Sequence, residues 1–555
     1  MPPDQAARPP FKVISSRRLI ILAALYFLTV LNLNFWKFMF QTVELTSSGD
    51  FLFAVSLPLF LFGGLTAAFS LLVWPYLAKP ALIGLTLLSS ATGYAMLNYG
   101  IHIDIFMIRN VFETTWREAT DLVTPGWLAF VGVFGLLPSM WLARVKIEYQ
   151  PGGRELRSRL ILTGLALAAV VGLVALNYEH YSSFRRQHRY VTRFINPSNI
   201  IYGTVKYAKQ LALTQRNFVL IDDQVGRLAA PDPEPTVFIL IAGETARAMN
   251  FSLNGYPRPT NPRLTGRDII SFGDVTAAGT STNVALPSMF SDLPRARVDI
   301  EAAGFRENLL NLLEKAGYGV LWRENDEGCK NICDRVPTEN MTSLNNPRFC
   351  DGRYCYDQVL IDDLEEYLRT VTKDTFIVLH TMGSHGPTYY LRYTDEFRAF
   401  EPTCDTSDIR SCSSEALVNT YDNTIVYTDH IISETIDILK KFPGYKTGLL
   451  YVSDHGESLG ENGIYLHAAP YDRAPAEQLK VPMILWLSEM MQVQDGIDYD
   501  CLKESRDRPL SHDHLFHSIL GLMNVSSHTY QPELDLFRPC RPPEFQEPPS
   551  SNVAT

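Results

Sequence analysis

The sequence predicts a multi-span α-helical membrane domain followed by an α/β domain with a central, mostly parallel sheet. Five apolar runs lie before Tyr178, and each is about long enough to cross a bilayer as a helix. No apolar run of that length follows Tyr178. After residue 235 the chain alternates continuous apolar strands with helix-like segments. That alternation is typical of a parallel sheet covered on both faces. The length of 555 residues also exceeds that of one ordinary domain.

The membrane domain is predicted over residues 19–177, after an amino-terminal segment at 1–18 that carries basic residues. Its five runs are Leu19 to about Phe40, Phe51–Trp74, Ala81–Leu97, Trp127–Ala143 and Leu160–Leu176. The first run lacks a small-residue cleavage site, and four more runs follow it. We therefore interpret it as a retained anchor and not as a secretory signal.

Positive charge predicts which side of the membrane each loop occupies. Basic residues gather in the amino-terminal segment and between the fourth and fifth runs, whereas the loop 41–50 carries Glu44 and Asp50 and no Lys or Arg. The amino terminus is therefore expected inside. Because five spans place the two chain ends on opposite sides, everything after Tyr178 is expected outside.

The cysteines agree with that orientation. All eight follow residue 320, in the part predicted to be outside. An even count there fits disulfides in an oxidising compartment, and the absence of a CxxC pair argues against a zinc ribbon. Pairing by closeness in the sequence gives Cys329–Cys333, Cys350–Cys355, Cys404–Cys412 and Cys501–Cys540.

The part outside the membrane divides into three segments. Residues 178–235 mix basic and aromatic residues and are predicted to form a membrane-surface linker of short amphipathic helices. The α/β domain is expected over 236–541, and the Pro-rich tail at 542–555 is expected to be disordered. The predicted strands lie at 236–244, 317–322, 374–383 and 447–456, and the predicted helices at 305–316, 356–371 and 415–441.

Metal-ligating side chains follow the predicted strands. Glu244 ends the first predicted strand, and Asp454 and His455 lie at the end of the last. Function in parallel sheets lies at the carboxyl ends of strands, and this mixture of oxygen and nitrogen ligands suits Zn²⁺ and also Mn²⁺. A lone Asp-His pair can instead cap a strand, so the metal site depends on the predicted fold.

A hydroxyl-rich turn lies between the first strand and the next helix. Gly279 is followed by Thr280, Ser281 and Thr282. These residues have two interpretations. Ser and Thr often cap helices, and a hydroxyl at a helix amino terminus that faces a metal can serve as a nucleophile, because the metal lowers its pKa. Spacing alone does not distinguish Thr282 from its two neighbours.

Other polar residues in the same region admit two interpretations. His385 and His467 can bind a phosphate oxygen or a second metal, or they are ordinary loop histidines. Lys330 is either solvated surface or part of a cross-linked loop at the strand ends. The dense SHDHLFH cluster at 511–517 is interpreted as a helix start capped by Ser511 or Asp513.

Four stretches together resemble the membrane-bound lipid A phosphoethanolamine transferases, a family that includes the mobile colistin-resistance enzymes. The stretches are IAGETARAMNFSLNGYPRPTNP, AAGTSTNVALPSMFS, HTMGSHGPTYYLRY and YVSDHGESLGENGIYLH. The resemblance runs from the first span to about residue 540. It implies an α/β domain similar to alkaline phosphatase, in a protein of the bacterial inner membrane whose catalytic domain lies in the periplasm.

The resemblance also implies roles for individual residues. Thr282 matches the nucleophile, and it completes a zinc shell that matches Glu244, Asp454 and His455. Three further positions match groups that contact a second zinc or the substrate: His385, His467 and Lys330.

A segment of the membrane part, RNVFETTWREA, matches a region tied to donor-lipid binding. It points to Asn110, Thr114 and Glu118, which are spaced by four and would share one face of a helix. A solvated helix face is the alternative. Ala278 and Ser288 stand where the colistin-resistance type has a cysteine on each side of the nucleophile turn.

The implied reaction moves phosphoethanolamine from phosphatidylethanolamine to a phosphate of lipid A through a covalent phosphoethanolamine-threonine intermediate. The product carries less negative charge and would bind cationic peptides such as polymyxin less. The alternatives are a transferase acting on a core sugar or periplasmic glucan, a membrane-anchored phosphodiesterase or sulfatase-type hydrolase, and an inert scaffold. We expect a monomer, and the net charge of −11 argues against a nucleic-acid partner.

Overall fold

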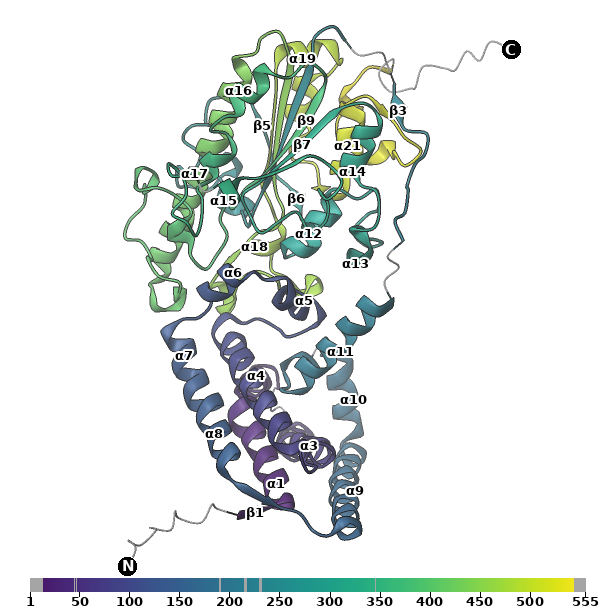
Figure 1. Ribbon diagram of the computed structural model, residues 1–555, viewed down its shortest axis with the longest axis vertical. Coiled ribbons are helices and arrows are strands. Elements are labelled where there is room, and N and C mark those ends of the chain that lie inside the picture. Colours follow the sequence, from purple (N-terminus) through teal and green to yellow (C-terminus); the bar gives the residue numbers. More distant parts are fainter. Residues whose placement is uncertain are drawn as a thin grey trace, which may run out of the picture. The chain divides into compact units, whose positions relative to one another are not determined.

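The computed structural model describes residues 13–43, 45, 47–188, 191–213, 217–228, 232–344 and 346–543. The predicted disordered tail lies outside these residues from position 544, and so do Arg8 and Lys12 of the basic amino terminus. The chain forms two compact units, coloured along the sequence in Figure 1. One comprises residues 1–113 with 123–208, and the other comprises 114–122 with 209–555.

The first unit is helical. Its long apolar helices are α3 (Ser48–Leu72), α4 (Ala78–Tyr99), the continuous segment Pro125–Arg144 that contains α7 (Pro125–Val131) and α8 (Leu137–Arg144), and α9 (Gly152–Leu176). Among the described residues these four are long and apolar enough to cross a membrane, and a bent pair formed by Ser16–Leu31 and Leu33–Thr42 gives up to a fifth span.

The first apolar run is not one straight helix. It consists of α1 (Ser16–Tyr26) with a π-helical continuation to Leu31, then α2 (Leu33–Thr42), bent by 58°. The break lies at Asn32, whose buried amide nitrogen donates to the carbonyls of Phe27 (2.9 Å) and Asn196 (2.8 Å). An amide in apolar surroundings needs such partners, and a run scored only for hydropathy does not reveal them.

The second unit is built on a mostly parallel sheet, as predicted, and this sheet has seven strands, three more than the sequence indicated. The strand order is β5-β13-β10-β4-β9-β7-β8. The strands are β5 (Ile270–Phe272), β13 (Met483–Leu487), β10 (Lys446–Ser453), β4 (Thr236–Gly243), β9 (Thr375–His380), β7 (Gly319–Glu324) and β8 (Thr338–Asn340). Only the pairings that involve β13 are antiparallel among the described strands of this sheet. All residues of β4 and β10 are buried, which explains their continuous apolar sequence.

Helices cover both faces of this sheet (Figure 1). On one face α12 (Thr282–Met289), α14 (Leu309–Lys315) and α21 (Asp513–Leu522) share a single apolar core with the strands. The opposite face carries α16 (Leu364–Arg369) and the long α17 (Ser414–Lys440). The register aligns the strand ends, since Gly243 pairs with Ser453, and His380 pairs with both Ala242 and Glu324.

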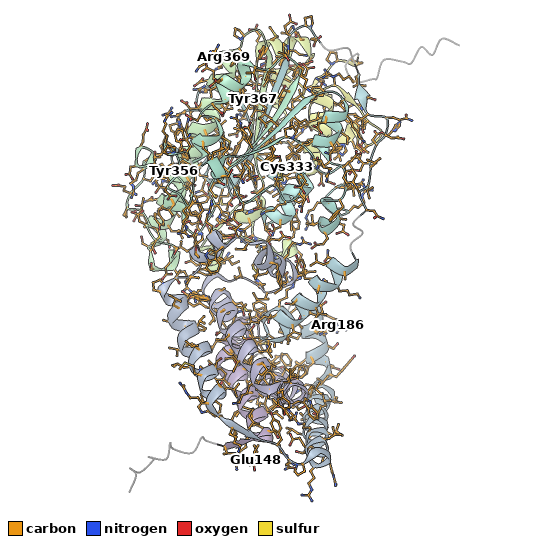
Figure 2. The ribbon with its side chains drawn as sticks, in the orientation of Figure 1. Glu148, Arg186, Cys333, Tyr356, Tyr367 and Arg369 are labelled. Atoms are coloured by element: carbon orange, nitrogen blue, oxygen red, sulfur yellow. A yellow bond between two sulfur atoms is a disulfide. The ribbon has the colours of Figure 1, made fainter. Side chains whose placement is uncertain are left out.

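Four disulfides join the cysteines in the pairs that closeness in sequence suggested. They are Cys329–Cys333, Cys350–Cys355, Cys404–Cys412 and Cys501–Cys540. Cys333 is labelled in Figure 2, where its loop follows β7. Between residues 178 and 213 the structure describes helices α10 (Tyr178–Gln187) and α11 (Ser198–Leu213), with a short 3₁₀ turn at Val191–Phe194.

Candidate metal and phosphate site

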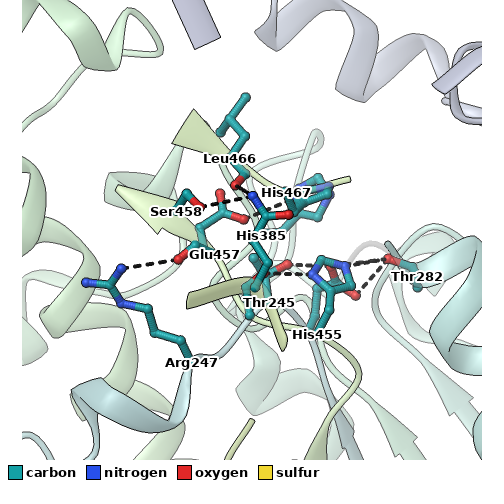
Figure 3. Close-up of polar contacts among 12 residues, drawn as sticks. Thr245, Arg247, Thr282, His385, His455, Glu457, Ser458, Leu466 and His467 are labelled. Carbon is teal, nitrogen blue, oxygen red and sulfur yellow. Dashed lines mark hydrogen bonds and ion pairs between the residues drawn. The ribbon is translucent and has the colours of Figure 1, made fainter. Parts of the chain in front are cut away.

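The carboxyl ends of β4 and β10 and the start of α12 bring four of the predicted residues together. Thr282 Oγ1 lies 3.1 Å from Glu244 Oε2 and 3.5 Å from His455 Nε2, contacts that Figure 3 draws. His455 Nε2 lies 3.5 Å from Glu244 Oε1 and 3.3 Å from Asp454 Oδ2. Glu244, Asp454 and His455 are fully buried. Two carboxylates, an imidazole and a hydroxyl thus surround one small volume.

These groups fit a divalent cation. Asp454 Oδ2 is buried and has no hydrogen-bond partner among the described residues, which is costly unless a cation lies beside it. Burial raises the pKa of Glu244 well above its usual range, and the charges of Asp454 and Asp326 raise it further. A bound cation would relieve that repulsion. The donor set of two carboxylates, one imidazole and a hydroxyl is one that Zn²⁺ accepts.

Thr245 holds the two carboxylates in place and was missed by sequence reasoning. Its hydroxyl donates to Glu244 Oε1 at 2.5 Å, and its backbone N–H donates to Asp454 Oδ1 at 3.1 Å. Thr245 has a φ of 57°, which is unusual for a β-branched residue. The adjoining turn approaches closely, because a Cβ on Gly383 would lie 2.5 Å from the Glu244 carbonyl oxygen. Gly383 itself has a φ of 50°, so two chain segments need unusual backbone conformations here.

The hydroxyl turn presents Thr282 and turns Thr280 away. Thr282 is the first residue of α12, after Ser281 at the N-cap position. The Thr280 hydroxyl donates instead to the Ala469 carbonyl at 2.7 Å. A hydroxyl in the first turn of a helix lies beside backbone N–H groups that favour an anion. This geometry supplies the distinction among the three hydroxyls that spacing left open.

The two loop histidines lie beside the central cluster. The rings of His455 and His467 are 4.6 Å apart, and those of His385 and His467 are 5.6 Å apart (Figure 3). Burial alone would lower the pKa of His467, but the Glu457 carboxylate 2.9 Å from its Nδ1 raises it. Burial lowers the pKa of His385 well below its usual range. The pair therefore offers one imidazole that favours a proton and one that favours the neutral form.

Lys330 lies in the loop closed by Cys329 and Cys333. It has a φ of 50°, and its Nζ donates to the Glu327 carbonyl at 3.2 Å. Its charge lowers the pKa of Asp326, although burial raises that pKa overall, to about 6. Lys330 is therefore near the carboxylates at the strand ends, and it is not a fully solvated surface residue.

The expected shared helix face of Asn110, Thr114 and Glu118 is wrong. Helix α5 ends at Glu113 and a separate helix, α6, runs from Trp116 to Asp121. The break follows from Thr115, whose hydroxyl accepts from the Glu118 N–H at 3.4 Å and so caps a new helix. Asn110 belongs to the helical unit, whereas Thr114 and Glu118 belong to the α/β unit.

Helix α6 reaches the site through Glu118. Its Oε1 lies 3.8 Å from His385 Nε2. Burial raises the pKa of Glu118 well above its usual range, and the nearby carboxylates of Glu327 and Asp326 add to this effect. A cationic ligand group beside Glu118 would offset this repulsion, so the carboxylate next to His385 suits such a group.

Asp121, a residue that sequence reasoning missed, anchors the same helix. Its buried carboxylate accepts hydrogen bonds from Arg353, from the Tyr354 hydroxyl at 2.5 Å and from the Thr388 hydroxyl at 3.2 Å. Arg353 and Tyr354 lie within the loop closed by Cys350–Cys355. The disulfide loop thus fixes the position of the helix that carries Glu118.

The SHDHLFH cluster starts a helix, as predicted, but neither Ser511 nor Asp513 caps it. Helix α21 begins at Asp513, and His512 occupies the N-cap position without a side-chain capping bond. His512 is buried instead: its Nδ1 accepts from the Ala278 N–H at 3.1 Å, and its Nε2 lies 3.0 Å from the Ser453 carbonyl.

The turn before Thr282 is therefore braced by hydrogen bonds and not by a disulfide. The Ala278 carbonyl accepts from Arg295 Nε at 2.6 Å, on the opposite side of the residue from the His512 bond. Ser288 donates to the Val284 carbonyl at 2.7 Å within its own helix. Hydrogen bonds thus fix both of the positions that lack cysteines. At Ala278 the bond to His512 connects the turn to the end of β10, because His512 also contacts the Ser453 carbonyl.

The chain is similar to known proteins over almost its whole length. A family model described as phosphoethanolamine transferase EptA/EptB matches residues 61–212, and one described as sulfatase matches residues 236–525. Phosphoethanolamine transferase EptA of Escherichia coli strain K12 is 42% identical over 529 residues, which are 94% of this chain and 96% of that protein. Phosphatidylethanolamine transferase Mcr-1 of Escherichia coli is 33% identical, over 93% of this chain and 95% of that protein.

A solved structure also matches over almost the whole chain. The integral membrane protein lipooligosaccharide phosphoethanolamine transferase A (EptA) from Neisseria meningitidis aligns with a TM-score of 0.93 and 39% identity. The alignment covers 96% of this chain and 100% of that chain.

Proposed function

Because this chain belongs to the phosphoethanolamine transferases, we propose that it moves phosphoethanolamine from phosphatidylethanolamine to a phosphate of lipid A. The observation that carries this proposal is the position of the Thr282 hydroxyl, 3.1 Å from Glu244 and 3.5 Å from His455 at the start of a helix. A nucleophile beside metal-ligating groups and helix N–H groups suits attack on phosphorus.

The proposed cofactor is Zn²⁺, held by Glu244, Asp454, His455 and Thr282. When bound, it would lower the pKa of the Thr282 hydroxyl and neutralise charge on the phosphate. The protein fixes the residues around that position: Thr245 orients both carboxylates, and the Gly456 carbonyl 2.9 Å from His455 Nδ1 orients the imidazole.

The reaction has two steps. In the first, Thr282 Oγ forms a bond to the phosphorus of the donor, the bond to the diacylglycerol oxygen breaks, and diacylglycerol leaves with the proton. In the second, a phosphate oxygen of lipid A bonds to the same phosphorus, the bond from that phosphorus to Thr282 Oγ breaks, and Thr282 Oγ takes the proton that the attacking phosphate gives up. His467 and Lys330 would neutralise the phosphate charge during both steps, and the neutral His385 would donate a hydrogen bond to a phosphate oxygen.

The donor is proposed to bind through its headgroup amine. Glu118 supports this role, since its carboxylate lies 3.8 Å from His385 and is fixed through Asp121. Asn110 and Thr114 remain proposed donor contacts. The chain is a multi-pass membrane protein, and we propose that it works as a monomer in the bacterial inner membrane with the catalytic domain in the periplasm.

A transferase that acts on another envelope sugar is the second candidate. It is favoured by a relative named Kdo(2)-lipid A phosphoethanolamine 7''-transferase from Escherichia coli strain K12, which is 25% identical over 89% of this chain. The GENGIYLH and HGPTYY stretches, which resemble the lipid A transferases, favour lipid A as the acceptor. A sulfatase-type hydrolase is disfavoured because the sequence lacks the C/S-x-P-S-R motif needed for formylglycine.

The test is to express the chain in a host that makes lipid A and to weigh the lipid A by mass spectrometry. We expect a phosphoethanolamine adduct from the intact chain, none from Thr282→Ala, and an adduct from the control Ser281→Ala. Polymyxin survival should follow the adduct. No adduct from the intact chain would reject the lipid A assignment, and an unchanged adduct from Thr282→Ala would reject the nucleophile.

A further inference from the structure

A second buried cluster adjoins the proposed zinc shell and shares Glu244 with it. Asp326 follows β7 and His380 ends β9, and both side chains are buried. Glu244, Asp326 and His380 each offer a ligand atom, and the three atoms lie within 4.8 Å of one another. His380 Nε2 and Asp326 Oδ2 are 3.7 Å apart, which is too long for a hydrogen bond.

The orientation of His380 is fixed from its other side. Its Nδ1 lies 3.0 Å from both oxygens of Glu324. Glu324 in turn accepts from Trp322 Nε1 at 2.8 Å and from the Asp326 N–H at 2.7 Å. A carboxylate that accepts from one imidazole nitrogen and leaves the other free is the usual support of a metal-binding histidine.

Two buried polar atoms of this cluster lack hydrogen-bond partners. His380 Nε2 and Asp326 Oδ1 are buried and make no hydrogen bond with any described residue. Native proteins pair such groups with protein, water or ions. The nearby carboxylates of Glu244, Asp326 and Asp454 also leave an excess of negative charge in a volume closed to solvent, and that excess favours a cation.

We propose that Glu244, Asp326 and His380 bind a second divalent cation, of the Zn²⁺ or Mn²⁺ class, with Glu244 shared between the two sites. Two oxygens and one imidazole nitrogen suit these ions, and three protein ligands leave a position for water or a phosphate oxygen. The inference rests on the proposed zinc shell only through the sharing of Glu244.

The alternative occupant of His380 Nε2 is a proton. Burial would lower the pKa of His380, but the carboxylates of Glu324 and Asp326 raise it to about 9. A protonated His380 would form a purely structural ion pair with Glu324. Metal content separates the two cases, because a proton adds no metal equivalent.

The test uses the full chain purified in detergent, stripped with a chelator, and dialysed against zinc alone or manganese alone. Metal per protein is then measured by mass spectrometry. Relative to the intact chain, Asp326→Asn and His380→Gln should each lose about one equivalent, and Glu244→Gln should lose about two. His430→Gln, which removes a half-buried imidazole bonded to Gln358, should lose none. Circular dichroism checks that each variant is folded.

Unchanged metal content in folded Asp326→Asn and His380→Gln would overturn the proposal. Anomalous diffraction from crystals of the intact chain grown with zinc gives a measurement that does not depend on variant folding. A peak bounded by Glu244, Asp326 and His380 is expected, and no peak there overturns the site. Failure of the transfer assay with both metals still bound would reject the proposed function and leave this site standing.

Discussion

Position distinguishes Thr282 from the two hydroxyl residues that precede it. The three have similar chemistry, and spacing could not rank them. In the structure the Thr280 hydroxyl is bonded to Ala469, while the Thr282 hydroxyl faces Glu244 and His455. The supporting residues Thr245 and His512 were not predictable, because their roles depend on contacts between segments far apart in sequence.

His512 gives a prediction at the scale of one residue. His512→Ala leaves the Ala278 N–H without its acceptor inside the protein. We expect a loss of about 1–3 kcal/mol in the free energy of unfolding, together with lower transfer activity because the turn before Thr282 loosens.

Chemical denaturation of the full chain in detergent measures this change. His514→Ala removes an acceptor of the same kind, since the Ser511 N–H donates to His514 Nδ1 at 3.1 Å. This site is only half-buried, so water can replace the lost acceptor, and this matched control should cost less. Equal losses in the two variants would show that His512 is not a specific brace.

The break between α5 and α6 shows that a side-chain cap can divide a segment that residue spacing predicts as one helix. A spacing of four predicted one helix face, but Thr115 starts a new helix. The apolar strands were predictable because complete burial produces unbroken apolar sequence, as in β4 and β10. Short elements such as β5 and β8 contain three residues each and carry too little pattern to be found.

Helix α6 should lose its position when its anchor is weakened. Asp121→Asn removes the negative charge of a carboxylate that pairs with Arg353 and accepts a hydrogen bond from the Tyr354 hydroxyl. We expect kcat/KM for the donor lipid to fall about tenfold, since a hydrogen bond to a charged group is worth about 1.5–3 kcal/mol. The effect should appear chiefly in the KM for phosphatidylethanolamine, because Asp121 acts through the placement of Glu118.

A fluorescent donor lipid allows this KM to be measured. Asp362→Asn, at an exposed ion pair with Arg348, is the matched control and should leave KM unchanged. If Asp121→Asn retained the KM of the intact chain, α6 would not position the donor.

At the scale of the whole molecule, the four disulfides should contribute unequally to stability. Cys501–Cys540 spans 39 residues and Cys329–Cys333 spans 4. Chain entropy predicts about 4 kcal/mol for the long loop and about 2 kcal/mol for the short one. The double variant Cys501→Ser/Cys540→Ser should therefore unfold at lower denaturant than Cys329→Ser/Cys333→Ser. The reverse order would indicate that local packing outweighs loop length.

Buried histidines predict how stability depends on pH. Burial lowers the pKa of His517 to about 4, and its Nδ1 accepts from the Gln531 N–H at 3.1 Å, which requires the neutral form. The unfolded chain has the ordinary value near 6.5, so it binds more protons between pH 6.5 and 4. The contribution of His517 is therefore complete above pH 6.5 and is lost as the pH falls towards 4.

Thermal melts of the full chain at pH 7, 6 and 5 test this dependence. The midpoint should fall with pH, and His517→Gln should flatten the fall because glutamine accepts the same hydrogen bond without titrating. His528→Gln, at an exposed imidazole, should keep the slope of the intact chain. An unchanged slope in His517→Gln would contradict the assignment.

The residues proposed to hold a cation stand at positions 244, 282, 454 and 455, and parallel strands must be joined by long crossovers. Non-local pairing of this kind is intrinsically slow. Because Glu244 and the Asp454–His455 pair meet only when β4 and β10 are paired, a cation would find its ligands after these strands have joined. Metal loading would then be a late event in maturation, and it would draw on the divalent ions of the compartment in which the domain folds.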